Sequence, residues 1–344
     1  MTQKFTYIKD FVSGDKIQDF FILAEAQMRE SRNGPFWNLT LQDCSGRIEA
    51  KVWSPLSQNI PQLSSGMFIR AGGSIGTFRD KLQFTVEALD VVDERQLGLE
   101  LSDYLPCSKV DPETMLQEID YLIAEYMTYK PWKKFCRNVL KSSSIRERLL
   151  MATGAKSVHH AYIGGLLEHT LSVCKLCMSI SSNYPGIDRQ AVLAAAIFHD
   201  LGKAWELSGG LVNDYTDEGR LLGHIYIGLE KLEPFLAREK SLPDELKLHL
   251  KHLILSHHGE YEYGSPKRPK TPEAFVLHYA DNIDAKMNTV FAELEKLEGT
   301  EKQWTPFQRY LDRYLYRAEV TPVAKDKKLE EVKDGNQCLL PLKE

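Results

Sequence analysis

The 344-residue sequence predicts a multidomain β plus α protein, with a small β-barrel at the N-terminus and an all-α domain after it. Two stretches in the first hundred residues alternate apolar and polar side chains, which is typical of strands with one buried face. From residue 112 to about residue 295 the apolar residues recur at helical spacing instead. With 43% hydrophobic and 26% charged residues, the composition is that of an ordinary globular protein.

The barrel prediction rests on two hairpins. Residues 35–53 alternate on both sides of an Asp-Cys-Ser-Gly turn, and residues 67–86 alternate likewise across residues 79–81. Short strands with glycines at the bends suit a Greek-key barrel of the OB-fold type, which is the barrel most often used on single-stranded nucleic acid. We therefore assign residues 1–98 to an OB-fold domain and residues 99–111 to a linker.

A nucleic acid would contact exposed aromatic and cationic side chains of this barrel. Alternation places Trp37 on the same strand face as Leu39 and Leu41, so most of the aromatic residues are expected to be core. Residues 1–95 carry 11 Lys+Arg against 12 Asp+Glu, so strong nonspecific affinity is not expected from this domain alone. The barrel candidates for substrate binding are Trp37, Arg47 and Phe78.

The helical domain begins at an Asp-Pro pair, residues 111–112, which suits an N-cap followed by the first helical position. Residues 112–295 are predicted helical except for 205–222, where paired glycines mark a loop or small hairpin. Residues 296–317 mix aromatics with arginines, and we predict a helix whose aromatic face packs on the helical domain. The alternative is that these side chains help to hold a nucleic-acid strand near the active site. A charged tail follows at 318–344.

A histidine and an aspartate stand side by side after the apolar run 191–196, which predicts a buried helix. His199 and Asp200 would therefore lie at the mouth of a core. Four more residues with metal-binding side chains follow or interrupt other apolar helical patterns. The predicted metal ligands are His169, His199, Asp200, His224, His257 and Asp281.

These four imidazoles and two carboxylates, drawn from five segments, could hold two divalent ions with Asp200 bridging. Mixed nitrogen and oxygen ligands suit manganese, iron, cobalt, nickel or zinc better than calcium or magnesium. Of these metals we expect manganese first. The chemistry indicated is attack of a metal-bound water or hydroxide on phosphorus, with the second ion stabilising the developing charge. The sequence thus predicts a metal-dependent phosphodiesterase.

The order His, His-Asp, two isolated His and Asp resembles the signature of HD-domain metal-dependent phosphohydrolases over residues 145–290. Within that superfamily, residues 159–170 and the Ser-His-His-Gly of residues 256–259 resemble the bacterial YhaM-type 3′-to-5′ exoribonucleases. In that family an OB-fold domain precedes the HD domain, so residues 112–295 are assigned as an HD domain. The resemblance implies a 3′-to-5′ exonuclease that hydrolyses single-stranded RNA to nucleoside monophosphates, with single-stranded DNA left open as a second substrate.

Asp200 and Lys203 are the candidate catalytic residues. Lys203 follows His199 by four residues and could reach a substrate phosphate, a role that the resemblance also implies. The alternative is that this lysine only stabilises the partial negative charge at the C-terminal end of a helix. Adjacent helical side chains point about 100° apart, so we favour His257 as the ligand and expect His258 to face the substrate or the outer shell. The remaining substrate-binding candidates are His160, Tyr162 and His258.

The same ligand set would serve a phosphohydrolase of nucleotides or other small phosphoesters, which is the main alternative. A di-iron oxygenase and a nonenzymatic nucleic-acid adaptor are less favoured, because the barrel argues against the first and the full ligand set against the second. A net charge of -5 and a pI near 6.1 argue against a positively charged surface over the whole protein. Contact with RNA must therefore be limited to a small region.

The N-terminus lacks the basic and apolar stretches of a signal peptide, and no run of 18 apolar residues occurs. We therefore expect a cytoplasmic protein without a membrane span. The sequence leaves open whether several chains assemble into a homo-oligomer.

Overall fold

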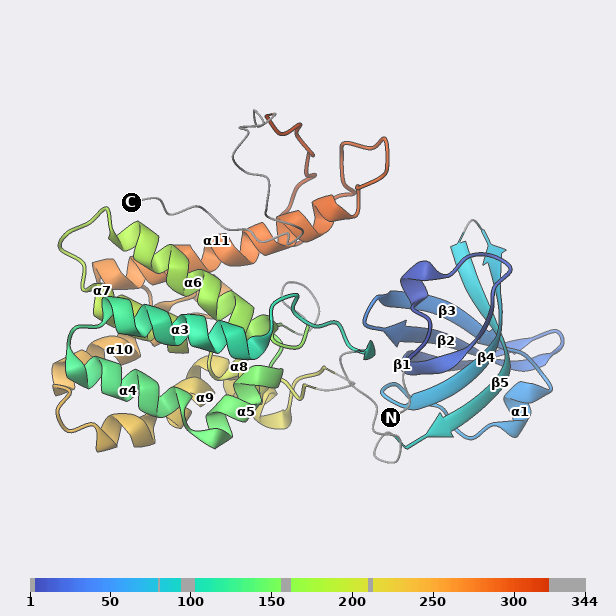
Figure 1. Cartoon of the computed structure of the whole chain (residues 1–344), viewed down its shortest axis with the longest axis horizontal. Helices are drawn as coiled ribbons and strands as arrows, with labels where there is room; N and C mark the ends of the chain where they lie inside the picture. Colours follow the sequence, from blue (N-terminus) through green and yellow to red (C-terminus); the bar gives the residue numbers. More distant parts are fainter. Residues whose placement is uncertain (1–3, 80, 94–102, 156–161, 210–212, 322–344) are drawn as a thin grey trace. The chain divides into compact units, whose positions relative to one another are not determined.

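The structure is a computed structural model that describes residues 4–79, 81–93, 103–155, 162–209 and 213–321. A five-stranded, OB-like barrel precedes a domain built from helices (Figure 1). This order confirms the predicted fold class.

The barrel closes with its strands in the order β1-β2-β3-β5-β4. β3 and β5 are parallel, and the other neighbours are antiparallel. The strands are β1 (Lys16–Ser31), β2 (Gly34–Asp43), β3 (Gly46–Val52), β4 (Phe68–Phe78) and β5 (Lys81–Val92). Two short helical elements accompany them, η1 (Ile8–Asp10) and α1 (Leu56–Asn59). Both predicted hairpins, β2–β3 and β4–β5, are confirmed.

The first strand closes the barrel because it pairs on both sides. β1 pairs with β4 along residues 16–22 and with β2 along residues 22–31, and its register shifts between Leu23 and Glu25. Such a shift bends a strand and increases its twist. One continuous strand can therefore belong to both edges of the sheet.

Alternation along β2 sets which side chains fill the barrel. Trp37, Leu39 and Leu41 are all buried, and Phe21 and Phe84 pack in the same core. Trp37 is only 2% exposed, so its ring offers no face to a base. Its assignment as a substrate contact is therefore wrong, for the reason that the strand alternation itself gives.

The helical domain has one core, to which most of its helices contribute apolar side chains. α7 is the most buried of these helices, since every residue from Ala191 to Phe198 is buried. The helices are α3 (Pro112–Tyr126), α4 (Lys130–Leu140), α5 (Ser143–Met151), α6 (Gly165–Ser181), α7 (Arg189–Phe198), α8 (Lys203–Glu206), α9 (Asp217–Arg238), α10 (Asp244–Ser256) and α11 (Pro272–Glu295), with the short η3 (Tyr261–Tyr263) after α10.

The helix boundaries follow local chemistry. Asp111 caps α3 by accepting a hydrogen bond from the backbone N–H of Thr114, and Pro112 is the first helical residue, as predicted. The predicted loop at 205–222 is shorter than expected. An antiparallel bridge joins Leu207 to Tyr215, and α9 starts at Asp217, after the cap Thr216.

The C-terminal prediction is wrong in one respect, because residues 296–317 contain no helix. Bridges between Trp304 and Tyr316 and between Gln308 and Arg313 join this segment to itself as a ribbon. Pro306 lacks the N–H that a helix interior needs. Asp312 has a φ of 54°, which turns the chain back instead of continuing a helix.

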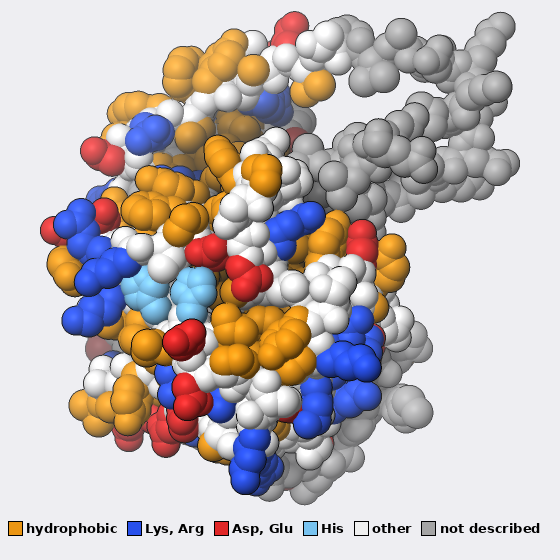
Figure 2. Space-filling model, turned by 90° about the vertical axis from the view of Figure 1, so that its left-hand side faces the viewer, with side chains coloured by type: hydrophobic (Ala, Val, Ile, Leu, Met, Phe, Trp, Pro, Cys, Tyr) orange, Lys and Arg blue, Asp and Glu red, His pale blue; other side chains and the backbone are white. Residues whose placement is uncertain are grey.

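None of the helices in the described ranges is long and apolar enough to cross a membrane. The face of the molecule in Figure 2 carries apolar, cationic and acidic side chains in small interspersed groups. This distribution agrees with the small net charge of the chain.

Candidate metal centre

The six predicted ligands meet in one cluster inside the helical domain. α6 carries His169, and His199 and Asp200 directly follow α7. His224 lies in α9, His257 directly follows α10, and Asp281 lies in α11. Four of the six, His169, His199, Asp200 and His257, are almost completely buried.

Asp200 is the centre of the cluster because its two oxygens face different groups of histidines. Oδ2 lies 3.3 Å from Nε2 of His169 and 3.5 Å from Nε2 of His199. Oδ1 lies 3.3 Å from Nε2 of His224 and 3.6 Å from Nε2 of His257. A carboxylate placed in this way can bridge two ions, and we refer to its two sides as the Oδ2 half and the Oδ1 half.

The Oδ2 half is rich in carboxylates. His169 Nε2 lies 3.2 Å from Asp281 Oδ1 and 3.1 Å from His199 Nε2. His199 Nε2 is 3.9 Å from the same Asp281 oxygen. On the opposite side of the His169 ring, Nδ1 is 2.6 Å from Asp284 Oδ2. His169 therefore lies among three carboxylates, two of which face the cluster.

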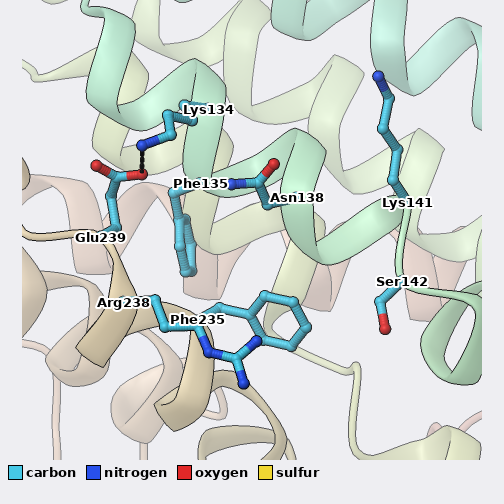
Figure 3. A pocket seen from close by; sticks show the side chains of 8 residues that line it. All are labelled: Lys134, Phe135, Asn138, Lys141, Ser142, Phe235, Arg238 and Glu239. Atoms are coloured by element: carbon cyan, nitrogen blue, oxygen red, sulfur yellow. Dashed lines mark ion pairs between the residues drawn. The ribbon is translucent and has the colours of Figure 1, made fainter.

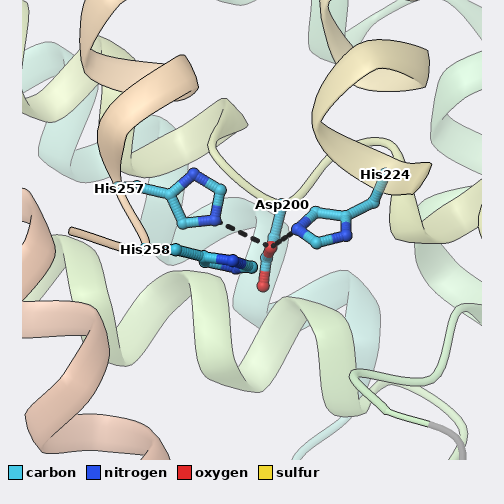
Figure 4. Close-up of side chains that lie close together, drawn as sticks. All are labelled: Asp200, His224, His257 and His258. Atoms are coloured by element: carbon cyan, nitrogen blue, oxygen red, sulfur yellow. Dashed lines mark ion pairs between the residues drawn. The ribbon is translucent and has the colours of Figure 1, made fainter. Parts of the chain in front are cut away.

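The Oδ1 half contains three imidazoles and a single carboxylate (Figure 4). Asp200, His224, His257 and His258 each offer one ligand atom, and these atoms lie within 4.8 Å of one another. Three of the atoms, Asp200 Oδ1, His224 Nε2 and His257 Nε2, are buried without a hydrogen-bond partner. Buried polar atoms are rarely left unpaired, so their convergence fits a bound divalent cation.

Hydrogen bonds on the outer side of each ring orient the imidazoles. Nδ1 of His199 lies 2.9 Å from the carbonyl oxygen of Ala196, and Nδ1 of His257 lies 2.7 Å from that of Ile254. Since a carbonyl only accepts, each Nδ1 carries the proton and donates it, and Nε2 keeps its lone pair for the cluster. This arrangement is usual for histidines that bind a metal.

The two remaining imidazoles of the Oδ1 half are held in similar ways. His258 Nδ1 donates to the carbonyl oxygen of Tyr263 at 3.0 Å. His224 Nδ1 is 3.3 Å from Glu206 Oε1, and the same oxygen accepts the backbone N–H of His224 at 3.0 Å. Glu206 therefore fixes both the ring and the backbone of His224.

Two glycines permit the close packing that this cluster requires. A Cβ on Gly202 would lie 1.9 Å from the carbonyl oxygen of His224, so only glycine lets this turn approach α9. Gly259 has a φ of 82°, and a Cβ there would lie 2.2 Å from the ring of His278. The close approach of two backbones thus explains Gly202, and the positive φ together with the adjacent His278 ring explains Gly259.

Adjacent His257 and His258 both face Asp200, although helical spacing predicted that they would diverge. Their ring centroids lie 4.2 Å apart, at an interplanar angle of 73°. α10 ends at Ser256, and the chain turns at Gly259, so the two residues do not share a continuing helix. His258 is consequently a further candidate ligand.

Burial and neighbouring charges set the protonation of the cluster. Burial would raise the pKa of Asp200, but the ammonium of Lys203 and the surrounding histidines hold that pKa well below its usual range. Burial lowers the pKa of His199 to about 4 and that of His258 to about 3. These groups are therefore a carboxylate and two neutral imidazoles near neutral pH, which are the forms that bind metals.

His169 behaves differently because three carboxylates surround it. Burial alone would lower its pKa, but hydrogen bonds to Asp200, Asp281 and Asp284 raise that pKa well above the usual value. Its ring therefore balances the negative charge of the Oδ2 half in the absence of a cation. A cation bound there would take over that balance and release the proton.

Lys203, the second candidate catalytic residue, is the first residue of α8. Its Nζ lies 2.7 Å from Asp200 Oδ2, and only 17% of its side chain is exposed. Burial would lower the pKa of Lys203, but the adjacent Asp200 carboxylate raises it. The ammonium therefore stays charged at the edge of the Oδ2 half.

The other candidate contacts lie apart from one another. Arg47 is exposed and donates from Nε to Gln42 Oε1 at 2.7 Å. Phe78 is 56% exposed at the end of β4, and the guanidinium of Arg79 lies 5.3 Å from its ring centroid. The hydroxyl of Tyr162 donates to Glu168 at 3.0 Å. His160 lies outside the described residues.

Two features of the site were not among the predicted site residues. Asp284 lies one turn after Asp281 on α11, so helical spacing could have placed both on one face. Nothing in the sequence indicated the role of Glu206, because its partner His224 is 18 residues away.

On the barrel, the ring of Trp53 stacks on that of Phe36, with their centroids 4.7 Å apart.

A hollow on the helical domain is lined by none of the residues of this cluster. It lies between α4 and α9 and is lined by cationic, polar and aromatic side chains (Figure 3). Lys134 is engaged with Glu239 at 3.0 Å, and Lys141 points away from the other side chains. Its cations do not converge on a common point, so the histidine cluster is the better candidate site.

Known protein families match both domains of the chain. Residues 166–286 match the HD domain family, and residues 24–92 match the family described as OB-fold nucleic acid binding domain. The first match contains all six predicted metal ligands, and the second contains most of the barrel strands.

Solved structures are similar to a part of the chain. The second OB-fold domain of replication protein A from Methanococcus maripaludis is 14% identical, with a TM-score of 0.22, over 26% of this chain and 94% of that one. The single-stranded DNA binding protein from Thermus aquaticus is 15% identical, with a TM-score of 0.21, over 23% of this chain and 40% of that one.

Fold and site together define a class of protein. The chain carries an OB-fold domain followed by an HD domain, and an HD domain implies a metal-dependent phosphohydrolase. The His/Asp cluster has the donor types and the unpartnered buried atoms that this class requires.

Proposed function

We propose that this protein is a metal-dependent 3′-to-5′ exonuclease that hydrolyses single-stranded RNA to nucleoside monophosphates. The observation that carries the hydrolytic part is the bridging position of Asp200, between two groups of histidines whose Nε2 atoms point inward. The substrate and the direction of cleavage are supported by the barrel and by the resemblance of residues 159–170 and 256–259 to YhaM-type exoribonucleases.

The proposal assigns one divalent ion to each half of the cluster. His169, His199 and Asp281 would hold one with Asp200 Oδ2, while His224, His257 and His258 would hold the other with Asp200 Oδ1. Bound there, a pair of divalent ions, manganese first, would lower the pKa of a water molecule and neutralise charge on the phosphate.

The remaining side chains of the site bind and orient. The Lys203 ammonium is placed to pair with a phosphate oxygen at the edge of the Oδ2 half. Asp284 and Glu206 hold the rings of His169 and His224, so that Nε2 of each ring faces inward. Near neutral pH the buried, neutral His199 has a lone pair on Nε2, which faces the cluster.

The barrel supports a single-stranded substrate because it exposes aromatic rings beside cations. Trp53 is 42% exposed and stacks on Phe36, and the ammonium of Lys51, which also pairs with Glu49, lies 5.5 Å from the Phe36 centroid. Phe78 and Arg79 form a second such pair. Bases stack on rings and phosphates pair with cations in barrels that bind single strands.

The decisive experiment incubates the full-length protein with Mn²⁺ and a 5′-labelled single-stranded RNA. We expect a ladder that shortens from the 3′ end and is lost in Asp200→Ala, by at least about a thousandfold in rate, because the variant removes the atoms shared by both halves. Asp244→Ala is the matched control, since the Asp244 side chain is 97% exposed on α10. Chelation of the metal should have the same effect as Asp200→Ala.

Three results would contradict the proposal. Equal activity of wild type and Asp200→Ala would exclude the cluster as the active site. Internal cuts in the RNA would exclude an exonuclease. Hydrolysis of nucleotides or of bis-p-nitrophenyl phosphate without any trimming of RNA would favour the alternative, a phosphohydrolase of small phosphoesters.

A further inference from the structure

The ribbon formed by residues 303–317 has no part in the metal centre or in the barrel. Gln308 N–H donates to the Arg313 carbonyl at 2.8 Å, and Arg317 N–H donates to the Gln303 carbonyl at 2.8 Å. Thr305 N–H donates to the Leu315 carbonyl at 3.0 Å. These bonds and the turn at Asp312 define a short two-stranded ribbon after α11.

The ribbon displays aromatic rings instead of burying them. Trp304 and Tyr316 face each other with ring centroids 4.9 Å apart, and Phe307 and Tyr314 do so at 5.2 Å. Tyr310, at the turn, is 79% exposed. All five rings are at least 45% exposed, so each pair offers ring surface to a partner.

Cations accompany the rings. Residues 302–317 contain four cationic side chains and one carboxylate, in a chain whose net charge is -5. Over the described part of the chain, none of these cations forms an ion pair with a carboxylate. The cations are Lys302, Arg309, Arg313 and Arg317.

We infer that this ribbon is a second binding surface for single-stranded nucleic acid, separate from the barrel. Rings accept bases of any sequence by stacking, and arginines whose charge no carboxylate neutralises attract phosphates, so the two features together match a polyanion with flat bases. The inference rests on the proposed function in that it takes nucleic acid as the substrate, and it adds where along the chain the strand is held.

A comparison within the molecule favours nucleic acid over a protein partner. α11 also exposes apolar side chains at every fourth position, from Phe275 to Phe291, but these include the aliphatic Ile283 and Met287. On the ribbon the exposed large apolar residues are all aromatic, and arginines lie among them. Aliphatic side chains suit protein contacts, whereas interleaved rings and arginines suit bases and phosphates.

The test measures binding separately from cleavage. Full-length protein carrying Asp200→Ala is titrated into a fluorescein-labelled twelve-nucleotide oligo(U) or oligo(dT), and the fluorescence polarisation gives Kd. Adding Tyr310→Ala and Tyr314→Ala should weaken binding about tenfold or more, which is the typical contribution of one or two stacked bases. Arg309→Gln should lower the slope of log Kd against log salt concentration by about one.

The matched control adds Tyr121→Ala and Tyr184→Ala, which remove two rings that are 66% and 58% exposed on the helical domain. This control should leave Kd unchanged, and thermal melting checks that each variant is folded. Equal Kd values for the ribbon variant and the control would overturn the inference. So would failure of the parent protein to bind either oligonucleotide.

One more measurement distinguishes binding of nucleic acid by the ribbon from association between copies of this chain. Mass photometry of the parent and the ribbon variant reports their oligomeric state. If the variant dissociates from a larger assembly while its Kd per site is unchanged, the ribbon joins copies of this chain and the inference is wrong. Binding that depends on the ribbon in a wild-type protein that does not trim RNA would keep the inference and reject the exonuclease.

Discussion

The two halves of the metal cluster share Asp200 but satisfy their ligand atoms in different ways. In the Oδ2 half, His169 contacts His199, Asp200, Asp281 and Asp284, so its ring is paired on both sides. In the Oδ1 half, the buried Nε2 atoms of His224 and His257 lie near Asp200 Oδ1 but form no hydrogen bond. The ligand atoms of the first half are therefore more fully paired with protein groups than those of the second half.

This difference predicts unequal affinity for metal. Two carboxylates, Asp200 and Asp281, face the Oδ2 half, whereas one carboxylate lies behind a ring in each half, Asp284 behind His169 and Glu206 behind His224. The Oδ1 half offers three imidazoles and only the shared carboxylate. Because opposite charges attract more strongly in a buried site, we expect the Oδ2 half to bind its ion more tightly.

The largest effects should come from removing one ligand of each half. His169→Gln and His257→Gln should each lose one metal ion per chain and slow phosphodiester hydrolysis by about a thousandfold, because one ion contributes several kcal/mol to the transition state. Mass spectrometry of the dialysed proteins counts the ions. After mild chelation of wild type, the remaining ion should be the one that His169→Gln lacks.

His252→Gln is the control for both variants, since His252 lies on α10 and its Nε2 accepts the backbone N–H of Lys270. It should keep both ions and full activity. A wild-type protein with a single ion per chain would refute the division into two halves while leaving hydrolysis intact.

Smaller effects are expected from the carboxylates behind the rings. Asp284→Asn and Glu206→Gln keep the shape of each side chain but remove its charge, and loss of such a partner typically costs 10–100-fold in metal affinity or activity. Asp284→Asn should cost more, because its contact with His169 is 2.6 Å and that of Glu206 with His224 is 3.3 Å.

Isothermal titration of the metal-free variants with Mn²⁺ measures both affinities. Asp284→Asn should weaken the tighter of the two binding events, and Glu206→Gln the weaker one. If both variants weaken the same event, the two halves are coupled through Asp200 and do not act as separate sites.

Ligand chemistry could be predicted from the sequence, but the grouping of the ligands could not. Histidine and aspartate at the ends of apolar helical segments are recognisable one by one, and all six such residues meet in the structure. The sequence predicted Asp200 as the bridge between two ions but did not divide the histidines between them, and the structure places Nε2 of His199 3.1 Å from Nε2 of His169. Such pairings depend on how α6 and α7 pack, which no single segment encodes.

The errors in the fold have similar causes. Alternation correctly placed Trp37 on the inner face, yet the residue type suggested a base contact. β1 escaped prediction because most residues from Phe20 to Leu23 are buried, so period-two alternation fails where the strand bends. In residues 296–317 the spacing of aromatics suggested a helix, but Pro306 and the turn at Asp312 redirect the backbone.

The smallest effect should come from Lys203→Met, which keeps the length of the side chain but removes its charge. An ammonium is not a metal ligand, so this variant should keep both ions. Since Nζ lies beside Asp200 Oδ2 at the edge of the Oδ2 half, loss of its contact with a phosphate oxygen should lower kcat/KM by about tenfold. Lys175→Met, on the exposed surface of α6, is the matched control. Loss of an ion from Lys203→Met would instead mean that the ammonium keeps Asp200 in place, and that Lys203 serves the metal centre and not the substrate.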